Sequence, residues 1–192
     1  MRAKLTQNKG SLQCIIPKEL TDRYGFKRGD EIWFEERPNE IAIQKPRMMA
    51  NSEVYTIGYE GRTLNQFIER VKKANIEQLI DVREVAFSRK QGFSKASLSK
   101  ALEEAGLRYR HIPELGSPGD VRYEYKNGGG LNEFMNSYRD YLATQSEPME
   151  NLKAFVMARR SILMCFERDP MACHRSVISE KLNEQGFALK HL

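Results

Sequence analysis

The sequence has no long apolar run and few cysteines, and each absence excludes a class of protein. No stretch approaches the roughly twenty apolar residues that a membrane-spanning helix needs. The N-terminus, residues 1–7, has no apolar core and does not resemble a signal peptide. The three cysteines are an odd number without the spacing of a disulfide framework. They predict free thiols in a reducing compartment. We therefore expect a cytoplasmic protein with no membrane partner.

Several motifs for cofactor binding and catalysis are also missing. The loop Gly58-Tyr59-Glu60-Gly61 is not the Gly-x-Gly-x-x-Gly of dinucleotide-binding folds. A cysteine phosphatase needs a phosphate-binding loop between its cysteine and its arginine, whereas only His174 separates Cys173 from Arg175. Neither Cys-x-x-Cys nor His-x-x-x-His is present to support zinc binding by Cys165, Cys173, His174 and His111. We assign no residue to a metal, and no particular cofactor is indicated.

Length and charge set broad limits on what is present. The 192 residues suffice for one medium domain and a small one, and 40% hydrophobic residues suffice for a core. The formal charge is +5. A polyanionic partner is compatible with this excess, but so is an ordinary soluble protein that is basic.

Residues 1–47 read as a separate small module. An alternating segment over residues 11–16 predicts a short strand, and Pro17 then opens a brief helix over residues 18–24 that Gly25 ends. A hairpin follows, with strands at residues 31–35 and 41–43 joined by a turn at residues 38–40. A unit of this size with few large apolar side chains is marginal alone, and association is one remedy.

The same residues resemble a known DNA-binding family. The segments Ile16-Pro17-Lys18-Glu19-Leu20 and Lys27-Arg28-Gly29-Asp30, with the closing hairpin, are similar to the swapped-hairpin domain of AbrB-type proteins. The resemblance implies an intertwined homodimer whose basic residues face DNA. The positive charge of the module is concentrated in its first thirty residues, as phosphate contact requires. The residues expected to contact DNA are Arg2, Lys4, Lys9, Lys18, Arg23, Lys27 and Arg28. A dimerisation module with a solvated basic face is the alternative.

Residues 48–53 read as a linker, and residues 54–192 alternate between strand and helix patterns. Strands are expected at residues 54–57, 78–82 and 107–112, then at residues 162–165 and 188–189. The helices between them include one that begins with a capping box of Thr63 and Gln66. Residues 114–130 read as a long polar loop. The alternation predicts an α/β fold, Rossmann-like in its mostly parallel sheet with helices on both faces.

In open parallel sheets, ligands bind outside the carboxyl ends of the strands. Polar and ionisable residues follow four of the expected strands here, together with the loop after the second strand. We expect a ligand or anion site formed by Tyr59, Asp81, Arg83, Ser88, Arg89, His111 and Arg175. Residues with the chemistry for catalysis lie beside them: Cys173, His174, Glu167, Glu60 and Cys165.

This part of the sequence also resembles a known family. The segments are Thr56 to Gly61, Asp81-Val82-Arg83, Ser88-Arg89, Tyr109 to Pro113, Leu115-Gly116, Cys165-Phe166-Glu167 and Cys173-His174-Arg175. They are similar to the domain-of-unknown-function family 488 over nearly all of residues 54–192. The resemblance implies an α/β fold and leaves the chemistry to be argued from the residues.

Cys173 is expected where a helix begins, directly before His174 and Arg175. Helix N-termini and neighbouring cations stabilise a thiolate, so Cys173 could be a nucleophile. It could equally belong to a binding site without reacting, or simply pack in the core. The sequence thus predicts a DNA-binding protein whose α/β domain binds or processes a nucleotide, nucleic acid or other phosphate-bearing ligand. A non-enzymatic transcriptional regulator with a ligand-sensing α/β domain is the alternative.

Overall fold

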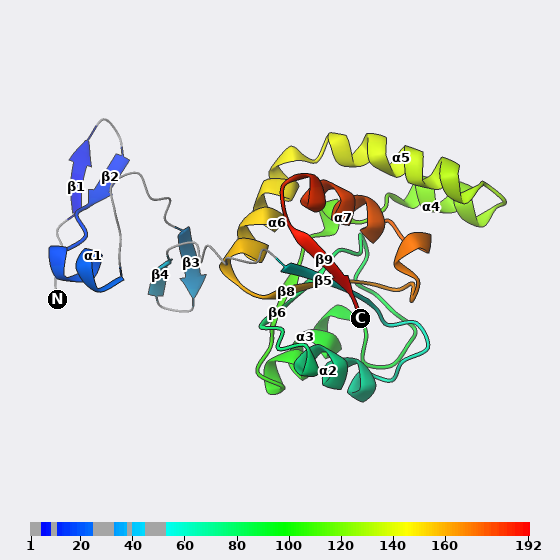
Figure 1. Ribbon diagram of the computed structural model, residues 1–192, viewed down its shortest axis with the longest axis horizontal. Helices are drawn as coiled ribbons and strands as arrows, with labels where there is room; N and C mark the ends of the chain where they lie inside the picture. The colour runs from blue at the N-terminus through cyan, green and yellow to red at the C-terminus, as the bar shows by residue number, and fades with distance from the viewer. Residues whose placement is uncertain (1–4, 9–10, 25–32, 38–39, 45–52) are drawn as a thin grey trace. The chain divides into compact units, whose positions relative to one another are not determined.

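The computed structural model describes residues 5–8, 11–24, 33–37, 40–44 and 53–192 (Figure 1). The chain forms two compact units, one over residues 1–47 and one over residues 48–192. Of the expected linker, residues 48–52 lie outside the described part, and Glu53 already belongs to the first strand of the second unit. Among the described residues, no helix has both the length and the apolar character to span a membrane.

The described residues of the first unit form two hairpins and one short helix. β1 (Leu5–Asn8) pairs antiparallel with β2 (Ser11–Cys14), and β3 (Trp33–Arg37) pairs antiparallel with β4 (Glu40–Gln44). Helix α1 (Lys18–Tyr24) follows Pro17, as the sequence predicted. β1 was not expected from the sequence, and β2 ends two residues before the expected strand over residues 11–16 does. Of the residues expected to contact DNA, Lys18 and Arg23 are exposed on α1, and the other five lie outside the described residues.

The second unit is built on a five-stranded sheet in which every pair of neighbours is parallel. Its strands are β5 (Glu53–Gly58), β6 (Gln78–Asp81), β7 (Arg108–His111), β8 (Ser161–Cys165) and β9 (Ala188–His191). They lie in the order β7-β6-β8-β5-β9. Gly58 is in register with Cys165, and Asp81 with both Met164 and His111, so four strands end together at one edge.

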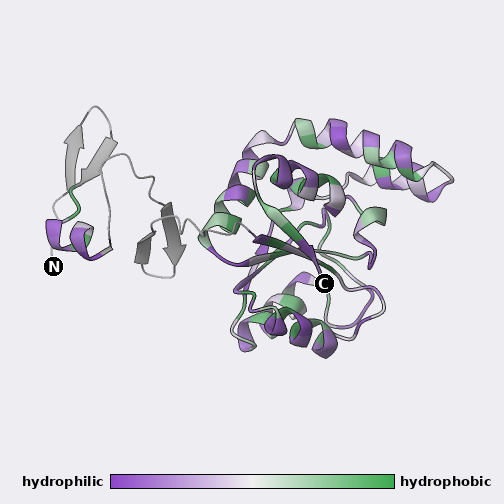
Figure 2. Ribbon diagram, viewed as in Figure 1, coloured by the Kyte–Doolittle hydropathy of each residue, from purple (hydrophilic) through white to green (hydrophobic). Residues whose placement is uncertain are grey.

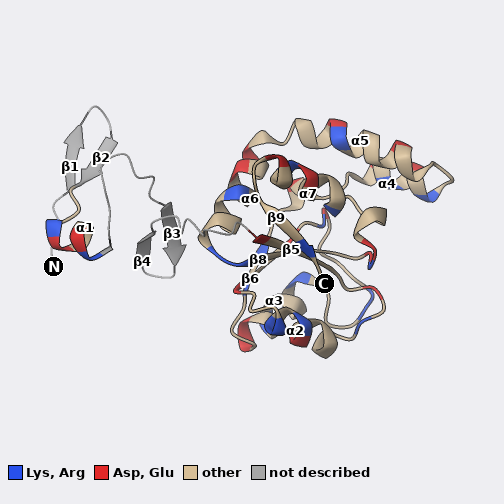
Figure 3. Cartoon of the chain, in the orientation of Figure 1, with Lys and Arg blue, Asp and Glu red and all other residues tan. Residues whose placement is uncertain are grey.

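Helices cover both faces of this sheet, which confirms the expected α/β fold (Figure 1). Helices α2 (Leu64–Lys73) and α3 (Lys95–Glu104) cover one face. Helices α5 (Leu131–Ala143), α6 (Ser146–Ala158) and α7 (Arg175–Glu184) cover the other. Apolar residues lie on the inner strands and on the helices that pack against them, and charged residues of both signs lie on the helices and on the loops (Figures 2 and 3).

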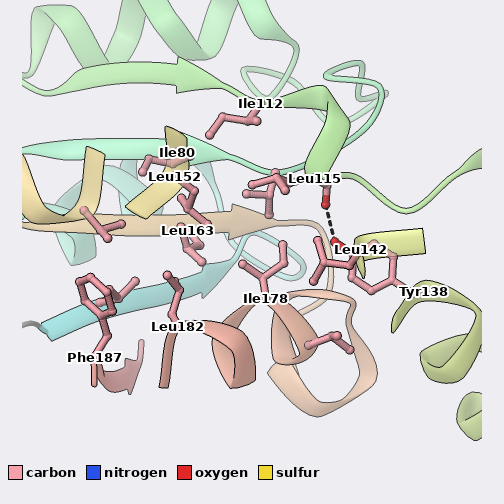
Figure 4. Close-up of a cluster of buried hydrophobic side chains, with 14 of the residues drawn as sticks. Ile80, Ile112, Leu115, Tyr138, Leu142, Leu152, Leu163, Ile178, Leu182 and Phe187 are labelled. Carbon is pink, nitrogen blue, oxygen red and sulfur yellow. Dashed lines mark hydrogen bonds between the residues drawn. The ribbon is translucent and has the colours of Figure 1, made fainter. Parts of the chain in front are cut away.

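Strand residues alternate between two cores because successive side chains of a strand point to opposite faces. Ile80 and Leu163 pack with Ile178 of α7 on one face (Figure 4), whereas Leu79 and Ile162 pack against α2 and α3 on the other. Both faces are therefore apolar, which is why the strands read as short continuous apolar runs.

Local signals in the sequence set several helix boundaries. The capping box is formed: the Gln66 backbone N–H donates to the Thr63 hydroxyl, and the Thr63 N–H donates to the Gln66 side chain. Helix α3 ends before Gly106, whose φ of 78° favours glycine. Ser94 immediately precedes α3, where the sequence predicts a helix cap, but its hydroxyl donates to the Ser88 carbonyl instead of capping the helix.

The expected long loop over residues 114–130 is wrong in its middle. After a short 3-10 turn, η1 (Pro113–Leu115), helix α4 (Gly119–Lys126) forms and packs on α5. The Tyr125 and Phe134 rings contact each other with centroids 4.9 Å apart. The sequence pattern did not indicate this helix, because glycines lie on both sides of it and most of its residues are polar. Its stability comes from packing against α5 and not from an apolar pattern of its own.

Candidate functional site

The site lies at a topological switch point, where neighbouring strands of the sheet connect to helices on opposite faces. β5 and β6 lead into α2 and α3 on one face of the sheet, whereas β8 leads into α7 on the opposite face. β8 lies between β5 and β6, so its connection leaves in the opposite direction from both neighbours. A crevice opens at the carboxyl ends where adjacent strands diverge in this way.

A cavity of about 430 Å³ occupies this edge. Residues that follow β5, β6 and β8 line it, together with residues from α4 and α5. The lining comprises Tyr59, Arg83, Glu84, Val85, Phe87, Ser117, Arg122, Tyr125, Lys126, Phe134, Cys165, Phe166, Glu167, Ala172 and His174. The size suits a small organic ligand, and the lining combines aromatic rings, cations and a group of thiol, imidazole and carboxylate.

Arg83 lies in this lining, but its hydrogen bonds go to the protein. Its Nε and Nη2 donate to the two Asp81 carboxylate oxygens at 2.8 and 2.6 Å, and its Nη1 donates to the Tyr59 hydroxyl and the Phe93 carbonyl. Burial lowers the pKa of Arg83, but the bonds and charge of Asp81 outweigh it and raise the pKa above its usual range. Asp81 and Arg83 thus form a buried ion pair that positions the strand ends.

The same carboxylate holds a second residue in place. The Tyr109 hydroxyl donates to Asp81 at 2.7 Å, and burial together with the Asp81 charge raises the pKa of Tyr109. The Tyr59 ring stacks on Phe93 with centroids 4.3 Å apart. These contacts hold in place the side chains of the cavity wall that follow β5 and β6.

The other expected site residues lie in varied places: Ser88, Arg89 and His111, expected to bind a ligand, and Glu60, expected to be catalytic. His111 has its Nε2 2.7 Å from the Arg83 carbonyl oxygen, and the Glu60 carboxylate accepts from the Arg168 N–H. Ser88 bonds within its own loop. Arg89 is exposed, and Ser88, Arg89, His111 and Glu60 are all absent from the cavity lining.

Arg175 is also outside the lining, at the start of α7. Only 1% of it is exposed, and its Nη2 donates to the Glu167 carbonyl at 2.7 Å. Its Nε and Nη1 have no hydrogen-bond partner among the described residues. Its guanidinium therefore fixes the Glu167 backbone from inside the protein.

The structure brings the expected catalytic residues Cys165, Cys173, His174 and Glu167 together. His174 Nδ1 lies 3.8 Å from the Sγ atoms of both cysteines, and the Cys165 thiol donates to the Glu167 carboxylate at 3.1 Å. β8 ends at Cys165, and the short turn η2 (Pro170–Ala172) reverses the chain so that Cys173 returns beside it. The Asp169 carboxylate accepts the Met171 N–H and begins this turn.

The imidazole of His174 has a fixed orientation. Its Nε2 lies 2.8 Å from the Val82 carbonyl oxygen, which can only accept. Nε2 must therefore carry a proton, and Nδ1 faces the two sulfurs. The ring also contacts the Tyr138 ring edge-on at 5.1 Å, so packing restricts its rotation.

The charges in this group influence one another. Burial alone raises the pKa of Cys173, but the Cys165 hydrogen bond and the charges of His174 and Arg175 outweigh it, so the Cys173 pKa falls well below its ordinary value. The hydrogen bond with Cys173, and then burial, raise the pKa of Cys165.

The two other titratable groups respond to the same thiolate. Burial lowers the pKa of His174, but the Cys173 thiolate reverses this, and the net shift is upward. Burial, and then the Cys173 charge, raise the pKa of Glu167. The shifts therefore run in opposite directions: the surroundings stabilise negative charge on Cys173 and positive charge on His174.

A family model matches most of the second unit. The model for "Domain of unknown function DUF488" matches residues 63–182, which is more than half of the chain. The chain belongs to the DUF488 family. The match includes Asp81 to Arg83 and Cys165 to Arg175, whereas the segment Thr56 to Gly61 lies just before it. No curated protein and no solved structure matches the chain.

Several residues that line the cavity of the DUF488 domain were not expected from the sequence. Arg122, Tyr125 and Lys126 come from α4, which was read as loop, and Phe134 comes from α5. Phe87 and Phe166 stand at the cavity with 68% and 43% of their surfaces exposed. The available signal for Phe166 was its position, an aromatic residue directly after the end of an expected strand.

Proposed function

We propose that the α/β domain binds a nucleotide or a short nucleic-acid segment in the cavity at the strand ends. The observation that carries this proposal is the composition of the lining, in which exposed aromatic rings stand beside cations. Aromatic rings stack on nucleobases at about 1–3 kcal/mol per base, and lysine and arginine attract phosphate.

Lys126 is the cation best suited to contact phosphate. It lines the cavity at the end of α4 and makes no ion pair within the part of the chain that the structure describes. Arg122 is more constrained, because it donates to Glu84 at 2.5 Å and to the Ser117 carbonyl. Phe87 and Phe166 expose the apolar surfaces on which a base can stack.

The thiol, imidazole and carboxylate group gives this cavity the chemistry to act on its ligand. Cys165, Glu167 and His174 lie in the lining, and Cys173 lies directly behind them. Our leading proposal is therefore that the α/β domain is an enzyme that processes its ligand. A regulator that only senses the ligand would have the same cavity without turnover.

The binding proposal is tested by titrating the full chain with a panel of nucleotides and a short single-stranded oligonucleotide. Affinity is expected to fall with rising salt, and Phe166→Ala and Lys126→Gln are expected to weaken it by about tenfold or more. Tyr123→Ala and Lys100→Gln are matched controls, since both residues are exposed outside the lining. Equal weakening by the controls, or no binding by the wild type, would contradict the proposal.

Turnover separates the enzyme from the sensor. Products are sought by mass spectrometry after incubation of each bound ligand with the wild type and with Glu167→Gln. A product that disappears in the variant while binding persists supports the enzyme. Binding without any product supports the sensor.

The first unit is proposed to bind DNA as an AbrB-like dimer. Its support is the charge of residues 1–47, with 10 basic and 7 acidic residues, and the exposed position of Lys18 and Arg23 on α1. The full chain is expected to sediment as a dimer and to bind duplex DNA with strong salt dependence. The double change Lys18→Gln and Arg23→Gln should reduce that dependence. A monomer in sedimentation would contradict the swapped-hairpin interpretation.

A further inference from the structure

Three side chains at the end of β8 and the start of α7 have the geometry of a metal-binding group. The sulfurs of Cys165 and Cys173 and a ring nitrogen of His174 all lie within 4.8 Å of one another. All three residues are buried, with exposed fractions of 4%, 1% and 5%. Among the described residues, this is the only group of at least three His, Cys, Asp or Glu ligand atoms so close together.

The imidazole of His174 faces both sulfurs. Val82 accepts the proton on His174 Nε2, which leaves Nδ1 directed toward the sulfurs. Histidines that bind metals usually donate their other N–H to a carbonyl or carboxylate, which fixes the ring and its tautomer. That partner is already in place here.

The spacing fits a tetrahedral ion bound by sulfur and nitrogen. Zinc bonds of about 2.3 Å to sulfur and 2.0–2.1 Å to nitrogen place those two atoms about 3.6 Å apart. His174 Nδ1 lies 3.8 Å from each sulfur. Thiolate and imidazole are ligands for zinc, whereas magnesium and calcium prefer oxygen.

We propose that Cys165, Cys173 and His174 bind a zinc ion whose fourth position is open to the cavity. Cys165 and His174 line the cavity, and Glu167 stands in the same lining with its carboxylate 3.1 Å from Cys165 Sγ. Zinc sites with three protein ligands keep a water in the fourth position. Glu167 is then placed to hold a proton of that water.

This inference goes beyond the proposed nucleotide binding and does not depend on it. Cys165 and Cys173 are separated by seven residues, which is not a zinc-binding spacing that can be recognised in a sequence. The turn η2 closes that separation and brings the two thiols beside the same imidazole. His111, which was considered as a further ligand, instead hydrogen-bonds the Arg83 carbonyl.

The test uses the full chain, purified under reducing conditions without a metal-binding tag and then loaded with Zn²⁺ or Co²⁺. We expect one zinc per chain by elemental mass spectrometry. We also expect a thiolate-to-cobalt charge-transfer band and tetrahedral d–d bands in the absorption spectrum. Cys165→Ser, Cys173→Ser and His174→Ala should each weaken binding by at least about tenfold, the lower bound for loss of even an indirect partner of a ligand.

Cys14→Ser is the matched control, because Cys14 is the remaining cysteine and lies in the first unit. It should retain one zinc and the cobalt spectrum. Glu167→Gln should retain the ion as well, since Glu167 is not proposed as a ligand. Loss of the ion in Cys14→Ser, or its retention in Cys173→Ser, would overturn the assignment.

A measurement on the wild type alone tests the proposal even if the variants fail to fold. Two thiols should react more slowly with a thiol reagent when zinc is present, and a chelator should restore their rate. Failure of the reduced wild type to bind zinc or cobalt overturns the proposal, as does a cobalt spectrum without the charge-transfer band. Nucleotide binding is measured separately with zinc-loaded and zinc-free protein, so failure of one proposal is distinguishable from failure of the other.

Discussion

Gly58 ends β5 at a point where the backbone of another segment comes very close. A Cβ atom added there would lie 1.8 Å from the Glu167 carbonyl oxygen and 2.8 Å from the Arg168 Cα. Atoms in folded proteins essentially never approach a Cβ closer than 3.0 Å. Gly58→Ala therefore requires the segment at Glu167 to move by more than about 1 Å, since the contacts are to backbone and cannot be relieved by a rotamer change.

The cost follows from the rigidity of both segments. The N–H groups of Tyr59 and Glu60 donate to the carbonyls of Cys165 and Phe166, and Arg175 holds the Glu167 carbonyl from the other side. Overpacking of this kind costs about 1–3 kcal/mol. For a chain of this size, that corresponds to a melting temperature lower by about 2–12 °C.

The assay is thermal and urea unfolding of Gly58→Ala followed by circular dichroism, with zinc stoichiometry measured on the folded variant. Zinc affinity should fall as well, because the displaced segment lies between Cys165 and Cys173. Gly130→Ala is the control, since a Cβ there meets only the Glu133 carboxylate at 3.6 Å. Wild-type stability and zinc affinity in Gly58→Ala would refute the close approach.

Two further substitutions test the buried polar contacts of the same domain. Asp81→Asn leaves the buried Arg83 charge without its partner and should destabilise the domain by about 3–5 kcal/mol in urea unfolding; Glu180→Gln, which breaks an exposed pair, should cost less than about 1 kcal/mol. Tyr138→Phe removes the 2.6 Å hydrogen bond to the Leu115 carbonyl (Figure 4) and should cost about 1–3 kcal/mol. Equal effects of Asp81→Asn and Glu180→Gln, or a neutral Tyr138→Phe, would contradict these contacts.

The sheet was predictable because its three inner strands, β5, β6 and β8, are buried on both faces. The apolar runs at residues 54–57 and 162–164 had no polar face to place in water, so a central position was the remaining choice. The location of the cavity followed from the general behaviour of parallel sheets. Neither inference needed the order of the strands, which the sequence pattern did not reveal.

The roles of single residues were harder to predict, because they depend on contacts across the sheet. Arg83 was expected to bind an anion, and the signal for its real partner was Asp81, two residues earlier on the same face of the strand. The neighbours of Arg89 and Ser88 depend on loop geometry that residue types do not specify. Helix α4 depends on packing against α5, and its cavity residues were missed with it.

The burial of the two thiols determines what chemical labelling of this protein measures. With 1% of Cys173 and 4% of Cys165 exposed, a bulky reagent reaches either sulfur only after the surrounding chain opens. When opening is fast and reversible, the labelling rate is the intrinsic rate multiplied by the open fraction. Alkylation kinetics therefore report the opening free energy of the η2 turn and the start of α7. A ligand that binds only the closed form should lower the alkylation rates of both cysteines, and the decrease should follow the fraction of protein that holds the ligand.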